Sequence, residues 1–351
     1  MQLGASGGIS RVTIQDVAGR AGVGAGTVSR VLNANANVSE RTRRRVEAAI
    51  DELGYKPDVA ARALRRGRTG TIGAVVPFFT KHFYVEVLRA VARATAATDL
   101  SLIVFDIERR EERERALGQV TAHGFLDGLL TVSLVPNDAE LRAIAASGLQ
   151  LVLIDGSHPA LSGVEVDHAH GAYLAVRHLV QLGHRRIALI GRPDDPFERG
   201  FGPRLEGYRR ALADANLDVD SSLLIAGEYS RESGRQAMEE LLRLAERPTA
   251  VFAASDLQAI GAMEAIREAG LRVPEDLAVV GYNDIELAEY LGLTTVRLPT
   301  ATMGEIGVRL LCESLAGDQV TPRRVRLRGE LVVRRTSGGP LVVDLPPGDL
   351  P

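Results

Sequence analysis

Residues 21–33 read AGVGAGTVSRVLN, and this stretch decides how the first part of the chain folds. Its glycines, Gly22, Gly24 and Gly26, suggest at first the phosphate-binding loop of a dinucleotide-binding enzyme. Such a loop follows a strand and spaces its glycines as G-x-G-x-x-G. Here the spacing is G-x-G-x-G, and residues 13–21 before it carry apolar side chains at helical spacing. The stretch therefore favours a tight turn followed by a DNA-reading helix.

Three short helices are predicted around this turn. The first covers 13–21 and ends at Gly22 in a left-handed C-cap. The second follows the glycines and carries the TVSR sequence. The third covers about 39–53 and ends at Gly54. Three short helices with one tight turn form the helix-turn-helix plan, which we expect over residues 11–57.

The charge is unevenly distributed along the 351 residues, whose formal net charge is −3. Residues 1–68 contain twelve Lys and Arg against six Asp and Glu, which leaves 30 against 39 for the remainder. A basic head on an acidic body is typical of a DNA-binding domain joined to a second domain. We see no signal peptide and no apolar run near the ~20 residues of a membrane span. We therefore expect a cytoplasmic, nucleoid-associated protein with no membrane partner.

The chain changes character after the predicted helices. The sequence YKPD at 55–58 interrupts the helical pattern, because proline biases the residue before it to an extended conformation. Residues 58–70 follow as a hinge that forms at most a short conditional helix. Beyond Gly70, short continuous apolar runs such as 72–77 and 277–284 alternate with amphipathic helical patterns. This alternation predicts two doubly wound α/β lobes with parallel sheets, whose ligands bind beyond the carboxyl ends of the strands.

Several motifs together carry a resemblance to a known family. They are VTIQDVAGRAGVGAGTVSRVLN, VSERTRRRVEAAIDELGYKPDVAARAL, HLVQLGHRRIALIG, RLEGYRRAL, AASDLQAIGAM and VGYNDIELAEYLGLTTVR. Over about 11–335 the chain resembles the lactose/galactose repressor (LacI) family of bacterial transcription regulators. The resemblance implies a sequence-specific repressor with a periplasmic-binding-protein-like core, whose two lobes close over a small effector, usually a sugar or a nucleobase. It also implies homodimers that bind pseudo-palindromic operator DNA.

The resemblance places the domain boundaries in the second half of the chain. The effector-binding and dimerisation core is expected over 71–335. The predicted N-lobe contains about 71–166 and 299–320, and the predicted C-lobe contains about 167–298 and 321–335. The glycine- and proline-rich tail, 336–351, is expected to be flexible and cannot carry a leucine-heptad helix, which favours a dimer over a tetramer.

The second and third helices carry side chains suited to DNA. Thr27 and Ser29 offer hydroxyls for phosphates or base edges, and Arg30 can pair with guanine through both arms of its guanidinium. The arginines that open the third helix, Arg41, Arg43, Arg44 and Arg45, are expected to neutralise phosphates. The resemblance places Ala25 and Gly26 at base-reading positions, and it implies that Leu64, with Ala61 beside it, enters the minor groove as an apolar wedge. Thr13, Asn33 and Tyr55 complete the predicted DNA-binding set.

The resemblance also implies a set of effector contacts. Arg204 has a guanidinium fork suited to vicinal hydroxyls or an anionic group, and Tyr229 corresponds to the aromatic wall that stacks on the ligand. Asn283 and Ser255 depart from the Asp and Asn that are frequent at these positions in the family. The full predicted set is Phe83, Tyr84, Asp155, Arg204, Tyr229, Asp256 and Asn283.

Other functions are weaker alternatives. A solute-binding protein of a transporter shares the core fold, but it needs an export signal and lacks a basic head. An enzyme that processes nucleosides or sugars is not expected, since no nucleophile, base and acid set is apparent. His168-Ala-His170 suggests a metal, but no third ligand lies at a supporting spacing, so neither a metal nor another cofactor is expected. Whether the effector is an inducer or a corepressor, such as a nucleobase, stays open.

Overall fold

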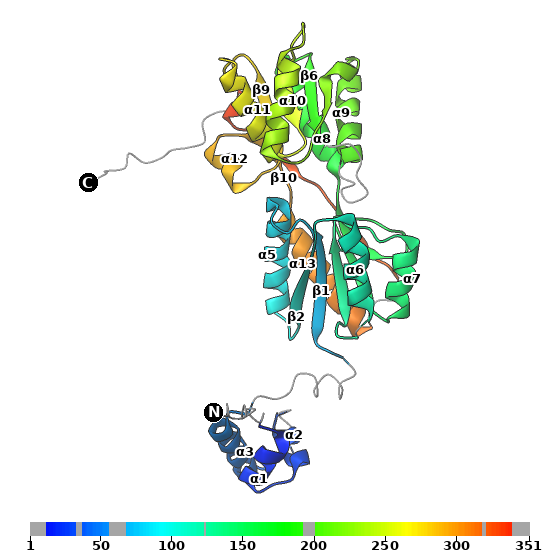
Figure 1. Cartoon of the computed structure of the whole chain (residues 1–351), viewed down its shortest axis with the longest axis vertical. Helices are drawn as coiled ribbons and strands as arrows, with labels where there is room; N and C mark the ends of the chain where they lie inside the picture. The colour runs from blue at the N-terminus through cyan, green and yellow to red at the C-terminus, as the bar shows by residue number, and fades with distance from the viewer. Residues whose placement is uncertain are drawn as a thin grey trace, which may run out of the picture. The chain divides into compact units, whose positions relative to one another are not determined.

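The structure of the chain is a computed structural model. The structure describes residues 12–32, 37–55, 68–122, 124–191, 201–317 and 321–338. The chain divides into two compact units, Met1–Thr69 and Gly70–Pro351. Figure 1 shows both units, with the first in blue and the second in cyan to red.

The first unit contains the predicted helix-turn-helix. Its helices are α1 (Ile14–Ala21), α2 (Ala25–Leu32) and α3 (Glu40–Leu53). Thr13 caps α1 in a capping box with Asp16, and Gly22 ends that helix with a φ of +61°. Apolar side chains from all three helices form one small core, whose buried members are Val17, Ala18, Ala21, Val28, Val31, Val46 and Ala49.

One of the predicted phosphate-neutralising arginines also contacts the turn after α1. The Nη2 atom of Arg45 donates to the backbone oxygen of Ala21 at 2.6 Å and lies 3.4 Å from that of Gly22. These carbonyls end α1, where helix geometry leaves oxygens without an intrahelical partner. The exposed Arg45 therefore ties the turn after α1 to α3, and its proposed contact with DNA phosphate stays a prediction.

The N-lobe of the second unit is a six-stranded parallel sheet, of order β2-β1-β3-β4-β5-β11. Helices cover both faces, with α5 and α13 packed together on one face and α6 and α7 on the other (Figure 1). The strands are β1 (Thr71–Pro77), β2 (Ser101–Ile107), β3 (Gly128–Val132), β4 (Gln150–Ile154), β5 (Ser162–Val166) and β11 (Arg324–Leu327). The helices are α5 (His82–Ala96), α6 (Arg110–Ala122), α7 (Asp138–Ala146) and α13 (Thr300–Ala316).

The C-lobe repeats the same plan, with the order β7-β6-β8-β9-β10-β12. Helices α8 and α9 cover one face of its sheet, and α10 and α11 cover the other. The strands are β6 (Ile187–Gly191), β7 (Leu224–Ala226), β8 (Ala250–Ala253), β9 (Ala278–Asn283), β10 (Thr294–Arg297) and β12 (Glu330–Val332). The helices are α8 (His168–Gln181), α9 (Phe201–Asp214), α10 (Arg231–Leu242), α11 (Asp256–Glu268) and α12 (Glu286–Tyr290), with 3-10 turns η1 (Ser221–Leu223) and η2 (Arg335–Ser337).

The fold prediction of two doubly wound lobes is confirmed, with one exception at the edge of the C-lobe sheet. Strand β12 pairs antiparallel with β10, whereas β10–β9, β9–β8, β8–β6 and β6–β7 pair in parallel. In both lobes the order reverses beside the first strand, between β1 and β3 and between β6 and β8. Such a reversal leaves a crevice at the carboxyl ends of the strands, where ligands bind.

The chain passes between the lobes three times. It leaves the N-lobe after Val166, returns after Arg297, and leaves again after Leu327. The predicted boundary that gave 321–335 to the C-lobe was therefore wrong for β11, because this strand pairs with β5 along its whole length.

The predicted start of the flexible tail at 336 also came too early. Thr336 and Ser337 are buried. The Thr336 hydroxyl donates to the backbone oxygen of Val279 at 2.8 Å, and the Ser337 hydroxyl lies 2.9 Å from Nε2 of His178. The remainder of the predicted tail, 339–351, lies outside the described residues.

No helix within the described ranges is long and apolar enough to cross a membrane. In the same ranges, no group of three or more His, Cys, Asp and Glu side chains is placed to hold a metal ion.

Gly22→Ala tests the turn that organises the first unit. Its φ of +61° is strained for a side chain, and an added Cβ would lie 2.7 Å from Nη2 of Arg45. We expect a loss of about 1 kcal/mol or more, measured by hydrogen exchange of α1 and α2 amides in the full chain. The matched control is Gly19→Ala, an exposed position in α1 with nothing within 4 Å, which should gain stability. Equal effects of the two changes would contradict this description of the turn.

Candidate functional site

A cavity of about 310 Å³ lies at the carboxyl ends of the strands, with walls from both lobes. Its N-lobe wall comes from the β1–α5 connection and from the ends of β3, β4 and β5, and its C-lobe wall comes from α8, α9, α11 and the end of β9. All the predicted effector residues line it: Phe83, Tyr84, Asp155, Arg204, Tyr229, Asp256 and Asn283. The cavity size falls at the lower end of the range of about 300–1,000 Å³ for small-molecule sites.

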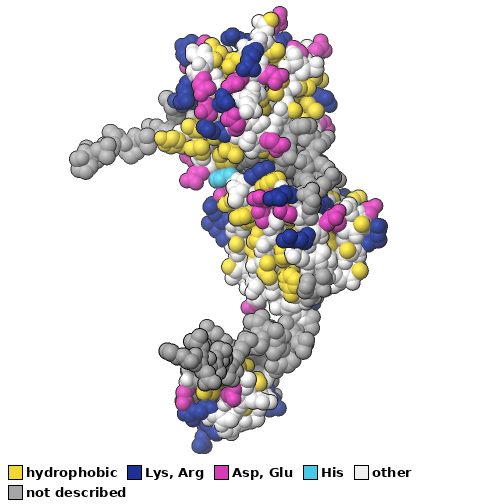
Figure 2. All heavy atoms as spheres, viewed as in Figure 1, with side chains coloured by type: hydrophobic (Ala, Val, Ile, Leu, Met, Phe, Trp, Pro, Cys, Tyr) yellow, Lys and Arg dark blue, Asp and Glu magenta, His cyan; other side chains and the backbone are white. Residues whose placement is uncertain are grey.

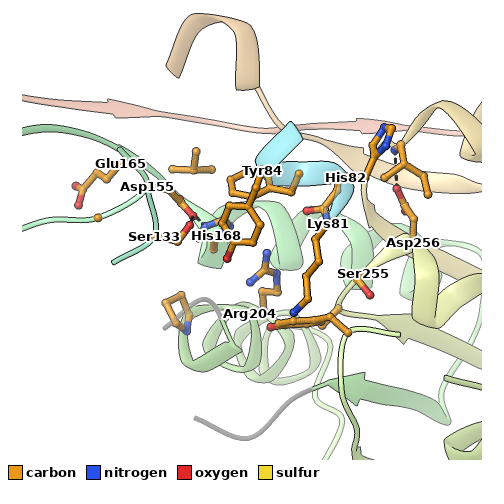
Figure 3. A pocket seen from close by; sticks show the side chains of 18 of the residues that line it. Lys81, His82, Tyr84, Ser133, Asp155, Glu165, His168, Arg204, Ser255 and Asp256 are labelled. Carbon is orange, nitrogen blue, oxygen red and sulfur yellow. Dashed lines mark hydrogen bonds and ion pairs between the residues drawn. The ribbon is translucent and has the colours of Figure 1, made fainter. Parts of the chain in front are cut away.

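Sequence reasoning missed several polar residues that line the same cavity. In Figure 3, Lys81 and Arg204 extend into one space from opposite walls, and His168 lies beside Asp155. Position was the signal for part of this set, because Ser133 directly follows β3 and His82 and His168 open helices. The polar residues not predicted as effector contacts are Lys81, His82, Ser133, Ser157, Glu165 and His168, and Ser255, noted above for its departure from the family, lines the cavity too.

Asp155 is held rigidly at the end of β4. Its backbone is left-handed, with a φ of +55°, as is that of Ser133, at +53°, after β3. The Ser133 hydroxyl donates to Oδ2 of Asp155 at 2.8 Å, and Nε2 of His168 lies 3.0 Å from Oδ1. Burial raises the pKa of the Asp155 carboxyl, but His168, Ser133 and Arg204 outweigh burial and bring that pKa below its usual value. The carboxyl is therefore a fixed, ionised acceptor.

Arg204 contributes a buried guanidinium to the opposite wall. The residue is 7% exposed, and its guanidinium carbon lies 4.3 Å from the ring centre of Tyr282 and 5.9 Å from that of Tyr229. A guanidinium over an aromatic face is stabilised by the ring quadrupole, most strongly where water is excluded. The two rings thus hold a planar fork of donors at the cavity wall.

Aromatic side chains give the cavity its apolar surfaces. Phe83 and Tyr84 pack edge to face at the start of α5, with ring centres 5.2 Å apart, and Tyr229 lies on the opposite lobe. The site therefore combines flat apolar faces with a carboxylate and a guanidinium. This combination suits a polar ring-shaped ligand with hydroxyl groups.

Asp256 lines the cavity, but its oxygens are bonded within the protein. Oδ1 accepts from the Thr295 hydroxyl at 2.5 Å, and Oδ2 accepts from the Ile285 amide at 2.8 Å. Burial raises the pKa of this carboxyl to about 6, although the bonds from Thr295 and Ile285 oppose the rise. Its observed contacts tie α11 to β10 and to the start of α12.

The N-terminal unit presents the predicted DNA-reading residues on α2. Gly26 and Arg30 are exposed, whereas Val28 and Val31 face the core. Residues at partly exposed positions are Ala25, Thr27 and Ser29, and Thr13 is exposed at the start of α1. Tyr55 packs against the small core. The predicted residues Asn33, Ala61 and Leu64 lie outside the described residues.

Comparisons with known proteins match both units. Residues 13–58 match the bacterial regulatory proteins of the lacI family, and residues 176–337 match a periplasmic binding protein-like domain. The chain is 39% identical to the HTH-type transcriptional regulator CelR of Thermobifida fusca, over 93% of this chain and 98% of that protein. It is 34% identical to the HTH-type transcriptional repressor PurR of Proteus mirabilis, over 94% of this chain and 98% of that protein.

Solved structures give the same match over 93% of the chain. A lac repressor dimer bound to operator and to the anti-inducer ONPF is 32% identical, with a TM-score of 0.85 and 99% of that chain covered. A complex of the transcriptional regulator CelR with cellobiose is 36% identical, with a TM-score of 0.71 and 100% of that chain covered.

The raised pKa of Asp256 predicts a pH-dependent contribution to stability. Because its folded pKa is about 6 and the ordinary value is 3.8, the contribution is present in acid and is lost as pH rises from about 4 to 6. Relative to Asp256→Asn, the wild type should lose about 3 kcal/mol of unfolding free energy across that window. Urea unfolding at a series of pH values measures the difference.

The matched control is Asp276→Asn. Asp276 is exposed and accepts from the backbone amide and the guanidinium of Arg272, which keep the pKa of its carboxyl below the usual value. The sign of its pH dependence should therefore be opposite. A wild-type minus Asp256→Asn difference that stays flat from pH 4 to 7 would contradict the assignment.

Proposed function

Because the chain belongs to the lacI family of bacterial regulatory proteins, we propose that it is a repressor whose operator binding is controlled by a sugar in the cavity between its lobes. The observation that carries this proposal is the cavity itself, since both lobes supply its walls. A ligand that contacts both lobes stabilises the lobe arrangement in which all contacts are made. The proposed division of labour is a DNA-binding unit over 11–57, a hinge over 58–70 and an effector core beyond it.

The side chains of the cavity favour a sugar. Aromatic faces stack on the apolar faces of a sugar ring, and a carboxylate and a guanidinium bond its hydroxyls. Among relatives, CelR has been solved with cellobiose, and a family member from Enterococcus faecium with ribose. Cellobiose is therefore the first candidate for this chain, with Arg204, Asp155 and Tyr229 as its principal contacts and Phe83, Tyr84, Asp256 and Asn283 completing the wall.

The proposed DNA contacts centre on α2 in the major groove. Ala25 offers only a methyl group and Gly26 only close backbone approach, so direct base recognition depends heavily on Arg30. Thr27 and Ser29 bond phosphates or base edges. The remaining proposed contacts are Thr13, Asn33, Tyr55, Ala61 and Leu64. Because a bacterial operator lies in the cytoplasm, we infer that the protein acts there.

A homodimer supplies the two DNA-binding units that a pseudo-palindromic operator requires. Two apolar surfaces on the core support it. Ile103 and Val104, 39% and 44% exposed, lie on the edge strand β2. Leu287 and Tyr290, 45% and 84% exposed, lie on α12, where Figure 2 shows hydrophobic side chains gathered at the surface. A solved relative, the lac repressor, is a dimer.

Arg30→Ala should weaken base discrimination. Loss of a bidentate contact to guanine costs about 1–3 kcal/mol of discrimination between matched and mismatched operators. The matched control is Arg44→Ala, an exposed arginine of α3 paired with Glu40, which should weaken matched and mismatched sites equally. Fluorescence anisotropy on operator variants, at fixed salt, measures both. Unchanged discrimination by Arg30→Ala would contradict the assignment of this residue to a base.

Cellobiose should stabilise the protein and change its affinity for operator. At 100 times its Kd, a ligand adds about 2.7 kcal/mol to the folded state, which a thermal-shift screen of sugars and nucleobases detects. Arg204→Leu should abolish this gain. The matched control Arg209→Leu changes an exposed arginine of the same helix and should leave the gain intact. Stabilisation by a nucleobase and by no sugar would overturn the sugar proposal.

A further inference from the structure

His168 makes a connection between the lobes that the sequence did not indicate. It is the first residue of α8, directly after the chain leaves the N-lobe, and it is 7% exposed. Its Nε2 atom lies 3.0 Å from Oδ1 of Asp155, and its Nδ1 atom lies 3.0 Å from the hydroxyl of Tyr282. One ring therefore bonds the end of β4 in the N-lobe and β9 in the C-lobe.

The Asp155 end of this connection sets the direction of the hydrogen bonds. An ionised carboxylate can only accept, so Nε2 of His168 donates to Asp155. In the tautomer that carries its proton on Nε2, Nδ1 accepts from the Tyr282 hydroxyl, which burial keeps protonated by raising its pKa. The geometry leaves little freedom, because a Cβ added at Gly171 would lie 2.7 Å from the Tyr282 oxygen.

The Asp155 end continues into the N-lobe. The Ser133 hydroxyl donates to the second oxygen of the same carboxylate, as Figure 3 shows. The series Ser133–Asp155–His168–Tyr282, here called the relay, thus places one donor on each carboxylate oxygen. Each oxygen retains acceptor capacity for a ligand in the cavity.

The relay also reaches the guanidinium on the opposite wall. Arg204 stacks on the ring of Tyr282, with its guanidinium carbon 4.3 Å from the ring centre. The relay therefore fixes the carboxylate of Asp155 relative to the guanidinium of Arg204 across the boundary between the lobes. A change in the angle between β4 and β9 alters the distance between Asp155 and Tyr282, and the relay resists this change.

We propose that His168 is a positioning residue that sets the lobe angle and the spacing of the Asp155 and Arg204 contacts together. Its role in effector response rests on the proposed function, whereas its role in the lobe angle does not. A second contact between the lobes, from the Glu286 amide to Nε2 of His82, is longer, at 3.4 Å, and exposed. The relay is shorter and buried, and buried hydrogen bonds are electrostatically stronger.

The first test measures the lobe angle without any ligand. Spin labels are placed on the exposed helix positions Ala143→Cys in α7 and Ala213→Cys in α9, in a Cys312→Ser background. Labelled protein is mixed with excess unlabelled protein, so that each measured pair lies within one chain. Electron–electron double resonance gives the distance distribution for wild type, His168→Leu and Tyr282→Phe. His170→Leu, two residues along the same helix, is the matched control.

The expected result is a distribution at least about twofold broader in His168→Leu and in Tyr282→Phe than in wild type or His170→Leu. The double variant should have a distribution no broader than that of the more affected single variant, because either change alone already breaks the relay. Gln in place of His168 can donate to Asp155 and accept from Tyr282, so His168→Gln should restore part of the narrow distribution. Tyr282→Phe removes a single oxygen and decides the outcome alone if His168→Leu does not fold.

The second test uses cellobiose as the probe. His168→Leu and Tyr282→Phe should each weaken cellobiose binding about tenfold or more. The double variant should bind cellobiose no more weakly than the weaker of the two single variants. Failure of wild type to bind cellobiose overturns that sugar as effector and leaves the distance test to judge the relay. Distance distributions of His168→Leu and Tyr282→Phe that match wild type overturn the relay, whatever cellobiose does.

Discussion

The three passages of the chain between the two lobes are the constraint on which the rest of the core depends. They follow β5, β10 and β11, so the late helix α13 packs in the N-lobe beside α5. These passages join the two lobes, and the carboxyl ends of the strands of both sheets line one cavity. A ligand there contacts two bodies joined by three short segments, and its binding energy can act on their relative arrangement.

The strand ends at this cavity are shaped by unusual backbone conformations. Ser133, Asp155 and Asp284 directly follow strands, Asn283 ends β9, and all four have positive φ values without being glycine. A left-handed residue with a Cβ costs roughly 1–2 kcal/mol, and such costs persist where the surrounding structure fixes the residue. At Asp155 that support is visible in Ser133 and His168. At Asp284 it is Arg297 and Arg334, whose guanidinium nitrogens lie 2.6 and 2.7 Å from its carboxylate.

Much of the fold could be predicted from the sequence, because long apolar runs and glycine caps are local signals. Four strands carry no long apolar run and are not signalled in this way, because they are short or polar: SGVEV in β5, TTVR in β10, RVRL in β11 and ELV in β12. Their place depends on partners far along the chain, as when β11 pairs with β5. The same limit explains both misplaced boundaries, at β11 and at Thr336.

The candidate site likewise contains residues that the sequence predicts and residues whose role depends on partners far along the chain. The seven effector residues came from motif resemblance, and one cavity contains them all. His168 was considered only as a metal ligand with His170, because its partner Tyr282 lies 114 residues away. No local pattern encodes that distance. The contact of Arg45 with the end of α1 was not predicted for a related reason, since only the folded unit brings the two together.

The central claim is that effector binding in the cavity and operator binding by the DNA-binding unit are thermodynamically coupled. It is tested most directly by measuring the Kd of the effector found in the screen twice, on free protein and on protein saturated with operator, together with the Kd of operator with and without effector. Linkage requires the two ratios to be equal. The account predicts equal ratios that differ from one by at least about fivefold. Effector affinity that is the same with and without operator would contradict it.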